Sequence, residues 1–129
     1  MIVHIDRAWL LDVAHRYLPG DPDVVDFGSL AAAVARHADR VMDRQVYPQP
    51  HHRAAALMHQ LIRVPALEYG NELFGAVVAA AYLTAGGAVV AADVKEAGDL
   101  AERIGREGLD VRAVADEIKT WIGREGEAL

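Results

Sequence analysis

The 129-residue sequence contains no cysteine, which excludes disulfide bonds, thiolate catalysis and cysteine-ligated zinc or iron–sulfur sites. Aromatic residues make up only 6% of the chain, whereas 53% of its residues are apolar and alanine is abundant. Small apolar side chains favour closely packed helices over a β-sandwich. We therefore predict an all-α protein with a single compact helical domain over residues 1–129, frayed at residues 1–5 and 124–129.

Clusters of positive charge are also missing. Lysine and arginine together number 13 against 19 acidic residues, which gives a formal net charge of −6. Proteins that bind nucleic acid do so largely through lysine and arginine on the phosphates. We therefore expect no nucleic-acid partner.

The longest uncharged run, from Leu73 to Ala92, has about the length of a bilayer span. However, Gly86 and Gly87 divide it and leave a helix of about 14 residues, or about 21 Å, which is too short to cross. We predict instead a central helix packed on all its faces and no membrane association.

The first residues do not read as a signal peptide. Charged residues Asp6, Arg7 and Asp12 interrupt the apolar run that such a peptide needs. We therefore expect a cytoplasmic protein.

Capping residues and breakers divide the chain into six predicted helices. Aspartates at positions 6, 26, 93 and 110 precede helical patterns and are good N-caps, whereas glycine and proline end the same patterns. The predicted helices span residues 7–18, 28–44, 51–63, 70–85, 94–106 and 111–122.

The central stretch "HHRAAALMHQLIRVPALEYGNELFGAVVAAAYLTAGGAVV" resembles the heart of a Fic/Doc protein, in particular the short Doc-type toxins of bacterial toxin–antitoxin modules. Their motif loop has the form H-x-F-x-[DE]-[GA]-N-[GK]-R, and the aligned loop here is "PALEYGNEL". The resemblance covers nearly the whole chain. It implies an all-helical fold with a buried helix after the loop, and a transferase that moves phosphate or AMP from ATP to a protein hydroxyl.

The first half of this loop has lost the residues that the resemblance assigns to proton transfer and metal binding. Pro65 replaces the histidine that acts as general base, and a proline side chain accepts no proton. Leu67 replaces the phenylalanine that anchors the loop in the core. Tyr69 replaces the acid that would hold magnesium, although Glu68 beside it could lean over.

The second half retains the turn but not the positive charges. Gly70 and Asn71 match the family and mark a vestigial anion site, whereas Glu72 and Leu73 replace the small or basic residue and the arginine. A phosphate oxygen about 4 Å from a unit charge interacts by about 4 kcal/mol at an effective dielectric near 20, and Glu72 reverses the sign. We expect no ATP, no other cofactor and no catalytic residue, and the replacements argue against an enzyme.

The six histidines do not suggest a metal site. His52 and His59 are seven residues apart, about 10.5 Å along one helix, which is too far for one zinc ion. His59 precedes the loop by six residues and is a candidate for a relocated base, but a satisfied or solvated histidine is the simpler interpretation. We expect no metal.

Three functions remain open. The favoured hypothesis is a Doc-like protein with a degenerate motif, inactive as an enzyme, that binds a protein partner such as an antitoxin-like segment in its groove. The second is an active transferase with rearranged residues such as Glu68, Tyr69 and His59. The third is a structural or small-ligand-binding helical protein. A homo-oligomer is also left open.

Overall fold

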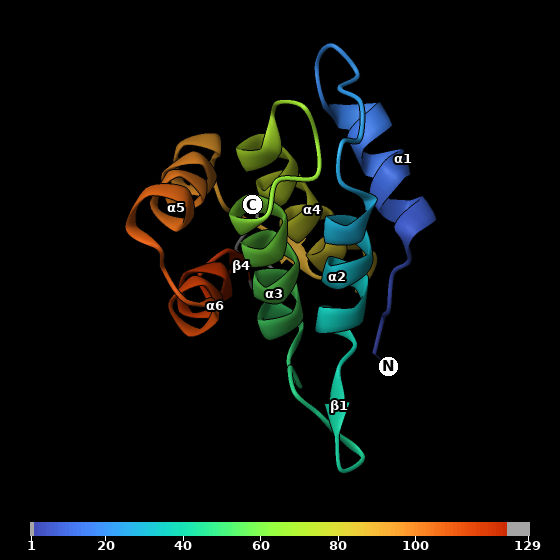
Figure 1. The fold of residues 1–129 in the computed structure, drawn as a ribbon. Coiled ribbons are helices and arrows are strands. Elements are labelled where there is room, and N and C mark those ends of the chain that lie inside the picture. Colours follow the sequence, from blue (N-terminus) through green and yellow to red (C-terminus); the bar gives the residue numbers. More distant parts are fainter. Residues whose placement is uncertain (1, 124–129) are drawn as a thin grey trace.

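The structure, a computed structural model that describes residues 2–123, has six α-helices in that range (Figure 1). The all-α prediction is confirmed, because the strands are only two residues long each. The helices are α1 (Arg7–Tyr17), α2 (Phe27–His37), α3 (Pro50–Arg63), α4 (Asn71–Ala85), α5 (Val94–Glu107) and α6 (Val111–Lys119). The strands are β1 (Arg40–Val41), β2 (Arg44–Gln45), β3 (Val89–Val90) and β4 (Ile122–Gly123).

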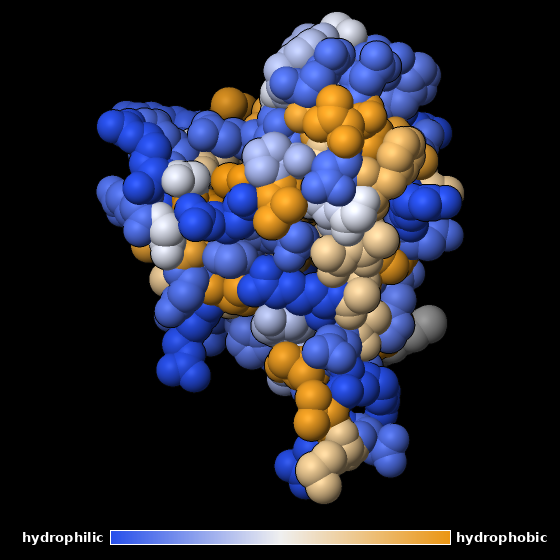
Figure 2. All heavy atoms as spheres, in the orientation of Figure 1, coloured by the Kyte–Doolittle hydropathy of each residue, from blue (hydrophilic) through white to orange (hydrophobic). Residues whose placement is uncertain are grey.

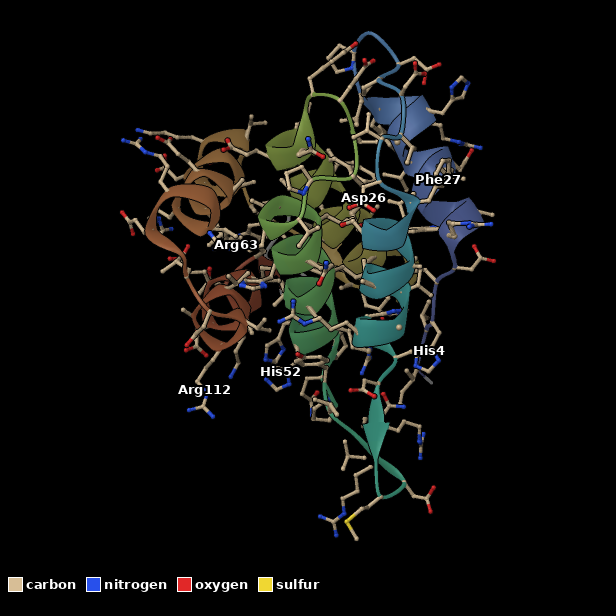
Figure 3. All side chains as sticks on the ribbon, in the orientation of Figure 1. His4, Asp26, Phe27, His52, Arg63 and Arg112 are labelled. Atoms are coloured by element: carbon tan, nitrogen blue, oxygen red, sulfur yellow. The ribbon has the colours of Figure 1, made fainter. Side chains whose placement is uncertain are left out.

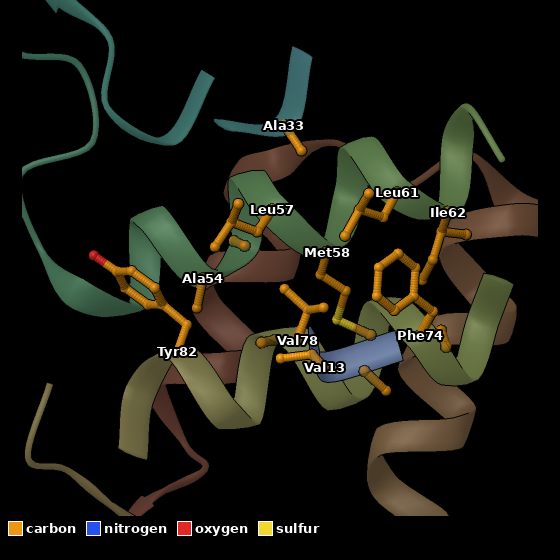
Figure 4. Close-up of a cluster of buried hydrophobic side chains, with 14 of the residues drawn as sticks. Val13, Ala33, Ala54, Leu57, Met58, Leu61, Ile62, Phe74, Val78 and Tyr82 are labelled. Atoms are coloured by element: carbon orange, nitrogen blue, oxygen red, sulfur yellow. The ribbon is translucent and has the colours of Figure 1, made fainter. Parts of the chain in front are cut away.

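Helix α3 lies at the centre of the fold and packs against α2, α4, α5 and α6. One cluster of apolar side chains between these helices forms the core (Figure 4). The sequence "AAALM" puts three alanines in succession at buried positions 54–56, so neighbouring helices approach α3 closely. Gly75 on α4 also allows close packing against α3, because a Cβ there would lie 2.7 Å from Ile62 Cγ1 on α3.

The predicted N-caps are present in the structure. The side chains of Asp6, Asp26, Asp93 and Asp110 each accept a hydrogen bond from the backbone N–H three residues later. Each satisfies an N–H group that a helix start leaves without an internal partner. The starts of α1, α2, α5 and α6 were therefore predicted within one or two residues.

The predicted length of α2 is wrong. The helix ends at His37, and residues 40–45 form the antiparallel β1–β2 hairpin rather than two further helical turns. Met42 and Asp43 turn this hairpin with positive φ angles of 51° and 64°, a conformation usually taken by glycine or asparagine. Figure 2 shows the hairpin projecting from the body with apolar side chains on it, and Met42 is 92% exposed.

Residues 2–5 are tied to the domain, contrary to the predicted fraying. The backbone N–H of Ile5 donates to His37 Nε2 at 3.1 Å, and Tyr82 Oη donates to the carbonyl oxygen of Val3. Tyr82 Oη in turn accepts from Arg53 Nε at 2.7 Å, and both of these side chains are buried. A buried polar network thus holds the segment against α2, α3 and α4. The predicted fraying of residues 124–129 lies outside the described residues.

Helix α4 packs beside the central helix α3 and against α1 and α5, but it is not packed on every face as predicted. Phe74, Val78 and Leu83 are buried, whereas Leu73 is 45% exposed and Val77 is only partly covered. The partly covered side faces α5. Among the described residues, no helix combines the length and the hydropathy needed to span a bilayer.

The last predicted helix is also shorter than expected. It ends at Lys119 rather than at residue 122, and Trp121 turns into the core instead. Strand β4 then pairs antiparallel with β3, which follows α4. This pairing brings the end of the described chain against the α4–α5 side of the domain.

Candidate functional site

The motif loop, defined here as residues 64–70, connects the end of α3 to the start of α4, and Asn71 holds it in shape. Asn71 Oδ1 accepts from the N–H groups of Ala66 at 3.1 Å and Leu67 at 3.0 Å. Asn71 Nδ2 donates to the carbonyl oxygen of Leu67 at 2.9 Å. One side chain therefore satisfies three backbone groups. Asn71 thus has a structural role in the loop that needs no ligand.

The loop is also paired with residues 23–26, the segment that leads into α2. The carbonyl oxygen of Ala66 accepts from the N–H groups of Val25 at 2.8 Å and Asp26 at 3.1 Å. Leu67 forms an isolated antiparallel bridge with Val24 and is 2% exposed. Leucine thus fills the anchoring position that the family gives to phenylalanine. Figure 3 shows Asp26 at the start of α2, beside this loop.

Glu68 and Tyr69 both contact the segment of residues 20–23. Glu68 Oε1 accepts from the N–H of Asp23 at 3.0 Å, and the N–H of Glu68 donates to the carbonyl oxygen of Asp23 at 3.0 Å. The tyrosine ring lies over the turn at Gly20, where a Cβ would meet Tyr69 Oη at 2.2 Å. The idea that Glu68 leans over to replace the missing acid therefore does not match its contacts.

Helix α4 begins without a side-chain cap. Gly70 occupies the N-cap with φ 79°, in the left-handed region, and no side chain accepts from the first turn. Glu72 lies in that turn and is exposed, but its carboxylate reaches across to α5, where a Cβ on Gly105 would lie 3.5 Å from Glu72 Oε1. The glutamate therefore places a negative charge in the first turn of α4 and turns it toward α5.

Among the described residues of the motif, position 65 offers no proton acceptor and positions 72 and 73 offer no cation. Pro65 is exposed and offers no lone pair on its side chain, and Leu73 is an exposed aliphatic residue. Arg63 at the end of α3 points toward the last turns of α5, where Arg63 Nη1 lies 3.5 Å from the carbonyl oxygens of Ile104 and Gly105. The loop thus has a backbone shape held by Asn71, and its side chains at positions 65 and 73 carry neither a proton acceptor nor a charge.

No family model matches the chain. However, it is 33% identical over 120 residues to a protein named Toxin Doc from Mycolicibacterium smegmatis (strain ATCC 700084 / mc(2)155), and the match covers 92% of each chain. The chain belongs to the Doc family. The resemblance inferred from the motif region is therefore confirmed over nearly the whole length.

His59 of this Doc-family chain is a satisfied histidine, as the simpler interpretation held. Its Nδ1 lies 3.0 Å from Arg36 Nη1 on α2, and because an arginine only donates, the ring nitrogen is the acceptor. Burial is the main cause that lowers the pKa of His59, and the charge of Arg36 adds to it. The ring therefore accepts a hydrogen bond from α2 and bridges α3 to α2.

His52 belongs to a different part of the surface. It lies beside Arg112 at the α3–α6 side of the domain (Figure 3), and both line a cavity of about 240 Å³ with Tyr47 and Asp116. Among the described residues, histidines and acids do not gather in any group of three that could hold a metal ion.

The buried Arg53–Tyr82 hydrogen bond was not predicted from the sequence. Arg53 is 3% exposed, and besides Tyr82 it donates to the carbonyl oxygens of Tyr47 at 3.0 Å and Pro48 at 2.8 Å. The signal was present, because an arginine directly before an alanine-rich run and a tyrosine within "AAAYL" both stand out in this Doc-family core. Their roles are structural, since they join the hairpin base and the N-terminal segment to α3 and α4.

Proposed function

We propose that this chain is a Doc-like toxin–antitoxin protein that has lost transferase chemistry and acts in the cytoplasm by binding a protein partner. One observation carries the proposal: the motif loop is held in a defined shape by Asn71, yet Pro65, Glu72 and Leu73 offer it no base and no cation. Its similarity to the relative named Toxin Doc supports the toxin–antitoxin context.

Exposed apolar side chains around the loop support protein binding as the remaining activity. Val25, Val64, Tyr69 and Leu73 are between 42% and 65% exposed, and they lie in the motif loop or directly beside it in the chain or the fold. Neighbouring exposed apolar groups are a feature of protein interaction sites. An antitoxin-like segment is the partner that this family context favours.

The alternative of a rearranged transferase has little support. Each side chain that could replace the lost groups has another partner: Glu68 bonds to the backbone of Asp23, Tyr69 covers Gly20, and His59 accepts from Arg36. A general base must come within hydrogen-bonding reach of the hydroxyl it activates. The contacts of these three side chains direct them toward residues in the range 20–36.

The first test is nucleotide binding. We expect calorimetric titration with ATP and magnesium to show no binding tighter than about 100 µM, which corresponds to about −5.5 kcal/mol. The combined variant Pro65→His, Tyr69→Asp, Glu72→Lys and Leu73→Arg should recover ATP binding. Each single replacement should not, because the cations that hold the phosphates and the general base act together. Tight ATP binding by the unaltered protein would overturn the proposal that the chain has lost transferase chemistry.

The second test is partner capture from the native host, with the co-purified protein identified by mass. Leu73→Glu should abolish co-purification if the surface around the motif loop binds the partner. Val41→Glu is the matched control, because Val41 is also exposed and apolar but lies on the hairpin, at the opposite end of the domain (Figure 1). Equal capture by both variants would place the partner elsewhere and remove the support for this interface.

A further inference from the structure

A cavity lies between α4 and α5, beside the motif loop. It has a volume of about 420 Å³, within the range of small-molecule sites. Its apolar walls come from α4, α5 and the β3 region, and Trp121, which is 2% exposed, also lines it. On α4 it extends from Glu72 to Ala80, about 12 Å along the axis.

Small residues keep this cavity open. Ala76 and Ala80 on α4 face Ala97, Gly98 and Ala101 on α5, so the two helices leave a space where larger side chains would meet. Leu73 and Val94, at opposite ends of the lining, are 45% and 90% exposed. An elongated apolar group would therefore bury surface that the protein alone leaves in contact with water.

The charges along the lining have one sign. Glu72 and Asp93 are the only charged residues among the lining residues. Asp93 Oδ1 already accepts from the N–H of Glu96 at 2.7 Å as the cap of α5. Glu72, in contrast, belongs to no ion pair within residues 2–123 and does not cap its helix. A cationic group on an apolar ligand would find its counter-charge at Glu72.

We propose that the α4–α5 cavity binds a small apolar ammonium compound, such as a primary alkylamine. The hydrocarbon chain lies along the alanines of α4 and α5 against Trp121, and the ammonium group lies at Glu72. The residue that opposes ATP phosphates in the old motif thus serves a ligand of opposite charge. This proposal goes beyond the partner-binding function and does not depend on it.

The test compares three probes with the same chain: octylamine, octanol and octanoate. Binding is followed by the fluorescence of Trp121 in a Trp9→Phe variant, because the chain has two tryptophans, and by calorimetry on the unaltered protein. We expect octylamine to bind with a dissociation constant below about 1 mM, octanol more weakly and octanoate most weakly. Equal affinities for the amine and the alcohol, or no binding of the amine, would overturn the proposal.

Two variants locate the site. Glu72→Gln should weaken octylamine binding about threefold to fivefold, as for an exposed ion pair, and leave octanol unchanged. Ala97→Leu, which fills the cavity, should remove the binding of both. The matched controls are Asp99→Asn and Ala31→Leu, at exposed positions outside the cavity lining, and both should bind octylamine like the unaltered protein.

Circular dichroism checks that each variant is folded. Unchanged octylamine binding by Ala97→Leu would show that the probe binds elsewhere and would refute the assignment. A partner protein that protects α4 and α5 from hydrogen exchange, together with no amine binding, would show that the cavity belongs to a protein interface instead.

Discussion

Replacement of Asn71 tests whether this retained motif residue is kept for the shape of the loop. In Asn71→Ala the N–H groups of Ala66 and Leu67 and the carbonyl oxygen of Leu67 lose their partner. Each intramolecular hydrogen bond contributes about 0.5–1.5 kcal/mol net, so the three together predict a loss of about 2–4 kcal/mol in the free energy of unfolding. For a domain of this size that corresponds to a fall in Tm of about 6–14 °C.

The assay is chemical and thermal unfolding, combined with hydrogen exchange at the two loop amides. Asn71→Asp is the informative comparison, because it retains the acceptor for Ala66 and Leu67 and loses only the donor to Leu67. It should lose about 1 kcal/mol or less and keep the two amides protected. Glu72→Gln, at the neighbouring position, should leave the loop amides unchanged. A loss below about 0.5 kcal/mol in Asn71→Ala would refute the idea that the side chain holds the loop.

Three further outcomes are expected. Asp43→Gly should stabilise the protein by up to about 1 kcal/mol in chemical denaturation, because glycine adopts φ 64° without strain; a loss of stability would contradict a strained turn. Tyr82→Phe should cost about 2 kcal/mol and speed hydrogen exchange at Ile5, because buried Arg53 loses its acceptor; unchanged exchange would argue against the network. Burial lowers the pKa of His37 below its ordinary value of 6.5, so the unfolded chain binds the extra proton, and the stability that His37 contributes is present above about pH 6.5 and lost as pH falls through the folded-state pKa. His37→Gln should flatten this pH dependence when the free energy of unfolding is measured from pH 7.5 to 5. An unaltered slope would show that His37 does not cause the dependence.

The geometry around His37 explains why its protonation matters. Nε2 accepts from the N–H of Ile5, and Nδ1 contacts the carbonyl oxygen of Val34, so a second ring proton would meet an N–H donor. His4 and Tyr82 pack edge-on against the ring, and the charges of His4 and Arg53 lower its pKa further. Acid should therefore loosen residues 2–5 before the rest of the fold.

Helix starts could be predicted from the sequence because their signals are local. An aspartate before a helical pattern supplies its own hydrogen bond within one turn, whatever the rest of the chain does. The end of α2 could not be predicted in this way. Residues 40–45 contain no glycine and no proline, and Met42 and Asp43 are unusual turn residues, so the hairpin lacks the usual turn signal.

Some features of the motif loop could likewise be predicted from the sequence, and others could not. The missing base and the missing cation could be predicted from single residues, since a proline side chain accepts no proton and a leucine carries no charge in any fold. The partners of Glu68, Tyr69 and His59 come from residues 23–49 positions away in the chain, and such contacts leave no local pattern.

The sequence by itself determined the helical class, the family and the absence of the motif's base and cations, because all three depend on residue identity and short-range spacing. The tertiary structure alone decided that Asn71 holds the loop, that Glu72 turns toward α5, and that a cavity remains between α4 and α5. These features depend on where whole helices pack against one another. Helix packing is set by many weak long-range contacts together, and no single stretch of sequence records their sum.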